Sequence, residues 1–130
     1  MVDDKSRGLP EDGGSVEAGV AALNFGEYAG AFRILLPHAE AGNAEDQASV
    51  GLLFFLGLGV NRDFQEATWW LKEAAAKGRG EAAHNLGTLF LTCESEFPVN
   101  PAESRKYYLM AHDLGFIVAS EEWYDQLRSC

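Results

Sequence analysis

The chain has 130 residues, 47% of them apolar, which is enough for one domain with a single continuous core. Its 10 basic and 20 acidic residues give a formal net charge of -10, which argues against nucleic acid and anionic lipid as partners, because both require a basic surface. A charged partner is therefore expected to be basic or neutral, and the alternative interpretation is a solvated acidic surface with no partner.

The first 14 residues, MVDDKSRGLPEDGG, are predicted to form a flexible acidic tail, because almost nothing in them can pack. The start of the chain lacks the apolar centre of a signal peptide, and no run of about 18 apolar residues follows, so no membrane insertion is expected. Cys93 and Cys130 have no CxxC spacing and are interpreted as unpaired thiols. We expect a cytoplasmic protein, and the alternative is a periplasmic or secreted one whose signal peptide has been removed.

From Val16 onward, apolar residues recur at helical spacing, and no strand or hairpin-turn pattern interrupts them. The sequence therefore predicts one all-α domain over residues 15–130. Its helices are expected, in chain order, at about 15–25, 27–41, 44–56, 64–77, 81–92, 101–114 and 118–127. Successive helices pair into hairpins at about 15–42, 43–78 and 79–115, and the last helix, within 116–130, is expected to cap the stack.

The strongest feature of the sequence is an internal repeat of 36 or 37 residues. Gly51 and Gly87 stand 36 residues apart, and Trp70 and Tyr107 stand 37 apart, at equivalent places in successive hairpins. Regular spacing of this kind is typical of stacked helical hairpins, each of which buries its apolar face against its neighbours.

Residues at the ends of the predicted helices fit capping positions. Asp63 and Asn100 are expected to be N-caps, and Gly78, like its equivalents in the other hairpins, ends a helix in the left-handed conformation. Gly57 and Gly59 fall in the turn of the second hairpin, where a positive φ is expected.

Gly51 and Gly87 fall inside helices, where glycine costs about 1 kcal/mol relative to alanine. Their recurrence at one place in the repeat indicates a compensating close approach to the second helix of the hairpin. Ala67 and Ala75 are expected to form the opposing small faces. The wider gaps are expected to be filled by larger apolar residues, namely Phe54, Trp70, Leu86 and Phe90.

One unit carries a nearly complete pattern of small and apolar residues at fixed spacing. It consists of Val50-Gly51, Phe54, Gly57, Gly59-Val60, Asp63, Ala67, Trp70, Ala74-Ala75 and Gly78. This pattern resembles the Sel-one-like repeat family, which is related to tetratricopeptide repeats. The next unit keeps most of it but replaces the turn glycines by CESEFPV (93–99). The resemblance covers about residues 16–127 and implies a right-handed α–α superhelix that serves as a protein-interaction scaffold.

No catalytic or cofactor motif is present: the chain has no HExxH, no cysteine–histidine zinc spacing, no Walker loop and no GxSxG. His38, His84 and His112 are scattered over three units, so they are interpreted as hydrogen-bonded or solvent-facing rather than as metal ligands. We therefore expect no enzyme, no cofactor and no metal.

In the architecture that the resemblance implies, the first helix of each hairpin lines the concave face. Candidate partner-binding residues on these helices are Ser49, Leu53, Leu56, Asn85, Leu89 and Thr92. Related repeats often carry an asparagine at the place of Asn85 that reaches the backbone of a bound peptide, and the alternative is a surface amide without a partner. For Leu53 and Leu89 the alternative is packing inside the solenoid.

Two aromatic residues occupy positions that are polar in the other units. Trp69 aligns with Arg33 and Lys106, so it is expected to face away from the core and to serve as an interface anchor. Phe116 similarly stands where other units have polar residues, and local packing is the alternative for both. The sequence thus predicts a non-catalytic adaptor for a protein or peptide, and the alternative is a self-associating or regulatory subunit of a larger complex. A weak homo-oligomer is a further expectation.

Overall fold

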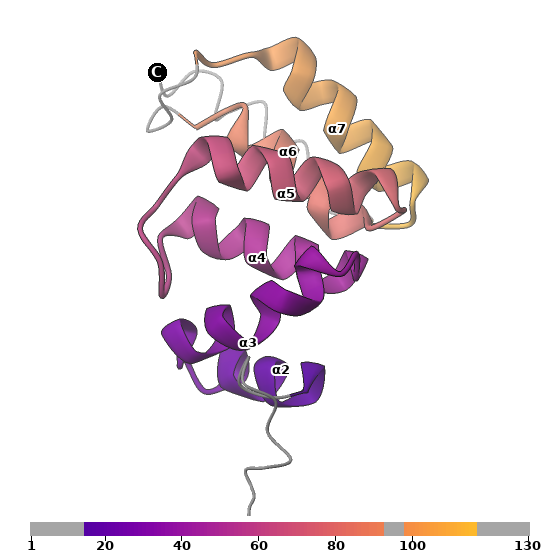
Figure 1. Ribbon diagram of the computed structural model, residues 1–130. Coiled ribbons are helices and arrows are strands. Elements are labelled where there is room, and N and C mark those ends of the chain that lie inside the picture. Colours follow the sequence, from indigo (N-terminus) through magenta and orange to yellow (C-terminus); the bar gives the residue numbers. More distant parts are fainter. Residues whose placement is uncertain (1–14, 93–97, 117–130) are drawn as a thin grey trace, which may run out of the picture.

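The computed structural model describes residues 15–92 and 98–116, and within these ranges the chain forms six helices and no strand. In chain order the helices are α2 (Val16–Asn24), α3 (Tyr28–Glu40), α4 (Ala44–Leu56), α5 (Phe64–Ala76), α6 (Gly80–Leu89) and α7 (Pro101–Asp113). They pair into hairpins α2–α3, α4–α5 and α6–α7, which stack from one end of the molecule to the other (Figure 1). The predicted all-α superhelix of hairpins is confirmed. The predicted tail at 1–14 and most of the predicted cap lie outside the described residues.

Polar side chains start the helices as the sequence predicts. The Asp63 Oδ1 atom accepts a hydrogen bond of 3.0 Å from the backbone of Glu66, and Asn100 Oδ1 accepts one of 3.1 Å from Glu103. Each bond satisfies an amide that has no partner inside its own helix. Gly78 follows the end of α5 with a φ of +94°, as expected for a left-handed helix end.

Helix α6 ends at Leu89, three residues before the predicted end at Thr92. The backbone bonds tighten there: the amides of Leu91 and Thr92 donate to carbonyls three residues back. The Phe90 carbonyl accepts a hydrogen bond of 2.8 Å from the Asn100 amide. This bond closes the α6–α7 hairpin, whose turn has no equivalents of Gly57 and Gly59.

The glycines inside the helices provide room for large side chains. A Cβ atom on Gly51 would lie 2.8 Å from the Leu71 Cγ atom, and one on Gly87 would lie 2.7 Å from the Tyr108 ring. The predicted close approach is confirmed at Gly51, where the added Cβ would also lie 3.2 Å from the Leu71 backbone nitrogen. The expectation that small faces oppose small faces is wrong. The three nearest atoms to each glycine belong to a large residue, which fills the space that the missing side chain leaves.

Ala67 and Ala75 are buried in the apolar core, at 0% and 6% exposure, so they contribute to packing although they are not the nearest neighbours of the glycines. The first hairpin contains a third contact between a helical glycine and a large side chain, which the sequence did not predict. Gly19 in α2 lies against Leu35 in α3. Leu35 and Leu71 stand 36 residues apart, so the packing of a leucine on a glycine recurs in the first hairpin.

The turn between α4 and α5 requires both of its glycines. Gly57 and Gly59 have φ values of +70° and +74°, as predicted. A Cβ on Gly59 would also clash with the Tyr28 carbonyl at the start of α3. This turn therefore packs directly on the first hairpin.

The described core consists of two neighbouring apolar clusters. Trp70 and Leu86 are buried, and Phe54 and Phe90 pack partly buried against the clusters, so all four fill space as predicted. Trp70 belongs to the cluster formed with α3 and α4, so its indole joins the first hairpin to the second.

Candidate partner-binding site

The residues predicted on the first helix of each hairpin do not form one continuous surface. Leu53 and Leu89 are only 2% and 0% exposed, so their assignment to partner binding is wrong: they are core residues, and packing inside the solenoid is correct. Ser49 and Asn85 are half-buried, and Asn85 has no hydrogen-bond partner among the described residues. Thr92 is half-buried but lies beyond the end of α6.

Phe116 combines local packing with exposure. Its Cβ lies where a side chain on Gly80 would need to be, and its ring centroid is 5.2 Å from that of His84. Burial lowers the pKa of His84, which favours the neutral imidazole beside the ring. Phe116 still keeps 39% of its surface exposed, so it packs locally and also presents apolar surface to the solvent.

Trp69 is the large aromatic residue that the helix spacing turns outward. Its side chain is 53% exposed, whereas the adjacent Trp70 is 7% exposed. The two indoles meet edge to face, with ring centroids 4.8 Å apart and planes at 90°. Trp69 is therefore held by a rigid aromatic neighbour while much of its surface is free for contact.

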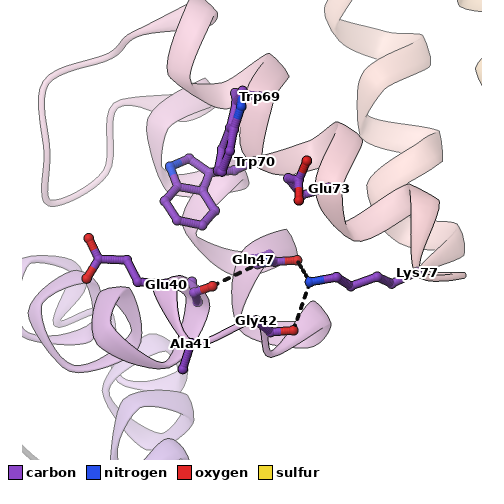
Figure 2. A pocket seen from close by; sticks show the side chains of 9 residues that line it. Glu40, Ala41, Gly42, Gln47, Trp69, Trp70, Glu73 and Lys77 are labelled. Carbon is purple, nitrogen blue, oxygen red and sulfur yellow. Dashed lines mark hydrogen bonds between the residues drawn. The ribbon is translucent and has the colours of Figure 1, made fainter.

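Both indoles line an open pocket of about 420 Å³ that spans two hairpins (Figure 2). Helix α5 forms one wall, the end of α3 and the following turn form another, and Gln47 of α4 contributes from between them. The charged side chains of the lining come from Glu40, Glu73 and Lys77.

A hydrogen-bonded frame fixes one side of the pocket. The Lys77 ammonium donates to the Gly42 carbonyl at 2.9 Å and to Gln47 Oε1 at 3.1 Å. The Gln47 side chain, 4% exposed as a residue, donates in turn to the Ala39 carbonyl at 3.1 Å. These bonds tie the end of α5 to the α3–α4 turn and so hold the two walls of the pocket together on this side. Sequence reasoning missed Gln47 and Lys77.

A buried carboxylate lies in the first turn of α4. Asp46 is 1% exposed, and neither of its carboxylate oxygens has a hydrogen-bond partner among the described residues. Burial raises the pKa of Asp46, nearby His38 lowers it, and Glu45 and Glu17 raise it further. The repeat could have shown from the sequence that Asp46 is buried. Its equivalent 36 positions later is the apolar residue Ala82, which belongs to the core.

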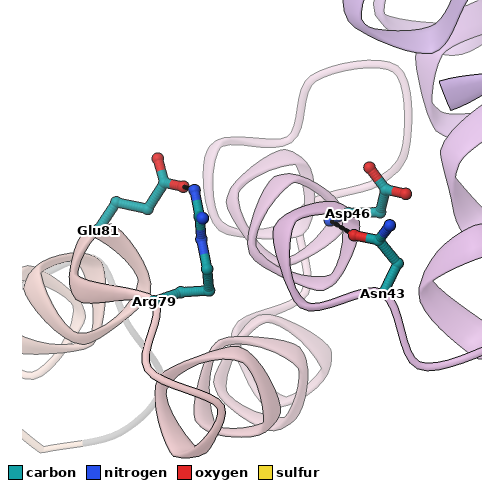
Figure 3. A network of polar contacts seen from close by, with 4 residues as sticks. All are labelled: Asn43, Asp46, Arg79 and Glu81. Atoms are coloured by element: carbon teal, nitrogen blue, oxygen red, sulfur yellow. Dashed lines mark hydrogen bonds and ion pairs between the residues drawn. The ribbon is translucent and has the colours of Figure 1, made fainter. Parts of the chain in front are cut away.

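The Arg79 guanidinium pairs with Glu81 and makes no hydrogen bond or ion pair with this carboxylate. Figure 3 shows that Asn43 accepts from the backbone of Asp46, while the Arg79 guanidinium turns to Glu81 at 2.7 Å. The hydrogen bond from Arg79 to Glu81 raises the pKa of the guanidinium, which stays charged. Both Asp46 carboxylate oxygens are thus buried without a hydrogen-bond partner among the described residues, which is costly in a packed interior.

A match to a family model covers the second and third hairpins: the Sel1 repeat matches residues 44–78 and 80–116, more than half of the chain. The chain belongs to the Sel1 repeat family. Sel1 repeats are generally non-catalytic protein–protein interaction modules. No curated protein matches the chain.

The two Sel1 repeats share a backbone pattern but differ where the pocket lies. Trp69 of the first repeat corresponds to Lys106 of the second, and Glu73 corresponds to Met110. Within the described ranges, no group of three or more acidic, histidine or cysteine side chains is placed to hold a metal, and none of the helices is long and apolar enough to cross a membrane.

Proposed function

We propose that this chain is a non-catalytic adaptor that holds a partner protein in the groove between α3 and α5, with Trp69 as the anchor. The observation that carries the proposal is the half-exposed indole at the edge of a formed pocket, in a family of interaction modules. Exposed tryptophans on rigid elements contribute a large share of the energy at many protein interfaces. The helix that bears Trp69 is held by core packing and loses little entropy on binding.

Partner capture from an extract of the source organism tests this function. The tagged full chain is incubated with extract, cross-linked and analysed by mass spectrometry, in parallel with Trp69→Ala and with Lys106→Ala. Because Lys106 occupies the same place in the second repeat, it is a matched control. Trp69→Ala should lose the partner that both other proteins retain. Equal capture by all three would contradict the anchor role.

Self-association is the second candidate function, and exposed apolar side chains favour it. Phe25, in the α2–α3 turn, is 83% exposed, and Leu109, on α7, is 54% exposed. Apolar side chains at the ends of a repeat stack are suited to pairing with another copy. Sedimentation velocity over a range of protein concentrations tests this candidate, and a monomer at every concentration would remove it.

A further inference from the structure

We propose that the pocket beside Trp69 and Trp70 receives the guanidinium group of an arginine from a basic segment of the partner protein. This inference rests on the proposed adaptor function and adds the chemistry of the partner. Figure 2 shows the components: two indoles, the Glu73 carboxylate beside them, and a lysine that is bonded elsewhere.

The second Sel1 repeat already contains a related interaction within its own chain. There the Lys106 ammonium lies 5.1 Å from the centroid of the Tyr107 ring. Lys106 and Tyr107 are the equivalents of Trp69 and Trp70, so the first repeat has an aromatic residue where the second has the cation. Among the described residues, no cation lies over either indole. The first repeat therefore presents an aromatic surface of the kind that attracts a cation, and none of the described cations of the chain occupies it.

The charges of the pocket favour a cation over an anion. Glu40 and Glu73 line the pocket and make no hydrogen bond or ion pair to other described residues. In the view of Figure 2 they lie on opposite sides of the Trp70 ring. The positive charge of Lys77 is already engaged by two oxygen acceptors, as described above. The net charge of -10 also steers basic segments toward the chain.

The positions one repeat further along the chain lack most of this chemistry. The equivalents of Glu40 and Glu73 there are Ala76 and Met110, and the equivalent of Lys77 is Leu114. The small residues and glycines of the repeat pattern recur at both places, whereas Trp69, Glu40 and Glu73 have no aromatic or acidic equivalent. The lining is therefore not needed to build the repeat, which is consistent with a role in binding.

Arginine fits the pocket better than lysine. Its planar guanidinium stacks on an indole, is more weakly hydrated than an ammonium, and offers five N–H donors in one plane. One edge of the plane can donate to the Glu73 carboxylate while a face covers Trp69. A pocket of about 420 Å³ also leaves room for the stem of the side chain and the neighbouring backbone.

Titration with three matched peptides tests the inference. The probe is three consecutive Gly-Ser-Arg units, and the comparison peptides carry lysine or uncharged citrulline in place of arginine. Nuclear magnetic resonance follows the indole N–H signals of the ¹⁵N-labelled full chain. The arginine peptide should shift the signals of Trp69 and Trp70 and bind more tightly than the lysine peptide. The citrulline peptide, which has nearly the same shape, should leave both signals in place.

Three variants locate the effect. Trp69→Ala should weaken binding of the arginine peptide by about tenfold, and the isosteric Glu73→Gln by about threefold. The control Lys106→Ala should bind like the unmodified chain. Unmoved indole signals at millimolar peptide, equal responses to arginine and citrulline, equal binding of arginine and lysine, or shifts spread over the acidic surface would each overturn the inference.

The outcomes separate this inference from the adaptor function. If the partner captured from extract is lost with Trp69→Ala while the arginine peptide gives no response, the adaptor function stands and the arginine inference is wrong. In that case an apolar side chain of the partner occupies the pocket. If the arginine peptide binds as expected and the captured partner does not depend on Trp69, the inference on the pocket stands and the anchor role is refuted.

Discussion

Replacing Asp46 with alanine should make the protein more stable. The carboxylate is 1% exposed and has no hydrogen-bond partner among the described residues, and the equivalent residue in the next repeat is Ala82. A buried polar group without a partner costs about 1–3 kcal/mol. Alanine also favours the helix by roughly 0.5 kcal/mol. Loss of a negative charge near the start of α4 opposes these gains by about 0.3–1 kcal/mol.

The expected net effect of Asp46→Ala is therefore a gain of about 1–2 kcal/mol in the free energy of unfolding at neutral pH. For a domain of this size, that gain corresponds to a rise in melting temperature of roughly 4–15 °C. Glu45→Ala is the matched control, because it removes an exposed carboxylate from the same helical turn. It should leave stability unchanged or slightly lower.

The pH dependence gives an independent check on the same carboxylate. Because the pKa of Asp46 is raised in the folded state, the folded protein binds more protons than the unfolded one between the ordinary value of 3.8 and the raised value. The contribution of Asp46 to stability therefore falls as the pH rises through this window and is constant above it. The advantage of Asp46→Ala should grow over the same window.

Urea unfolding followed by circular dichroism, at several pH values and for all three proteins, measures these differences. The claim that the buried Asp46 carboxylate destabilises the fold is refuted if Asp46→Ala is less stable than the unmodified chain at neutral pH. It is also refuted if its advantage is the same on both sides of the pH window.

Three further substitutions test the packing and the frame of the pocket. Gly51→Ala should destabilise the protein by about 1–3 kcal/mol, because its Cβ would lie 2.8 Å from the Leu71 side chain. Thermal unfolding measures this loss. A variant as stable as the unmodified chain would contradict the tight packing of Leu71 on Gly51. Gly30→Ala, its control, meets no atom within 4 Å and should stabilise by up to about 1 kcal/mol. Lys77→Met should cost about 1 kcal/mol in urea unfolding, because two hydrogen bonds are lost. An unchanged midpoint would mean that these bonds contribute nothing to stability.

The sequence predicted the hairpins well because the residues that define them are local. Caps such as Asp63 act on amides three residues away, and the spacing from Gly51 to Gly87 repeats the packing of one unit in the next. The first hairpin was harder, because Gly19 does not fall 36 residues before Gly51. Its turn has three residues (25–27), whereas the next turn has seven (57–63). The interval of 36 residues therefore does not relate the first helix of this hairpin to α4.

The pocket could be predicted only in part. The helical spacing correctly turned Trp69 outward and Trp70 inward, because neighbours on a helix point about 100° apart. Gln47 and Lys77 are 30 residues apart, and their contact depends on how one hairpin sits on the next, which no local pattern encodes. Leu53 and Leu89 were misassigned for a related reason, since the width of the exposed strip on a helix depends on its neighbours.

The shortened turn of the first hairpin affects how such proteins are counted and compared. Gly19 packs against Leu35 although the connection between their helices is four residues shorter than the one in the next hairpin. Searches that assume one period will stop short of such a unit and undercount the modules of a protein. Searching instead for a glycine and a bulky partner at any of the three separations found here, 16, 20 or 21 residues, would recover these overlooked ends.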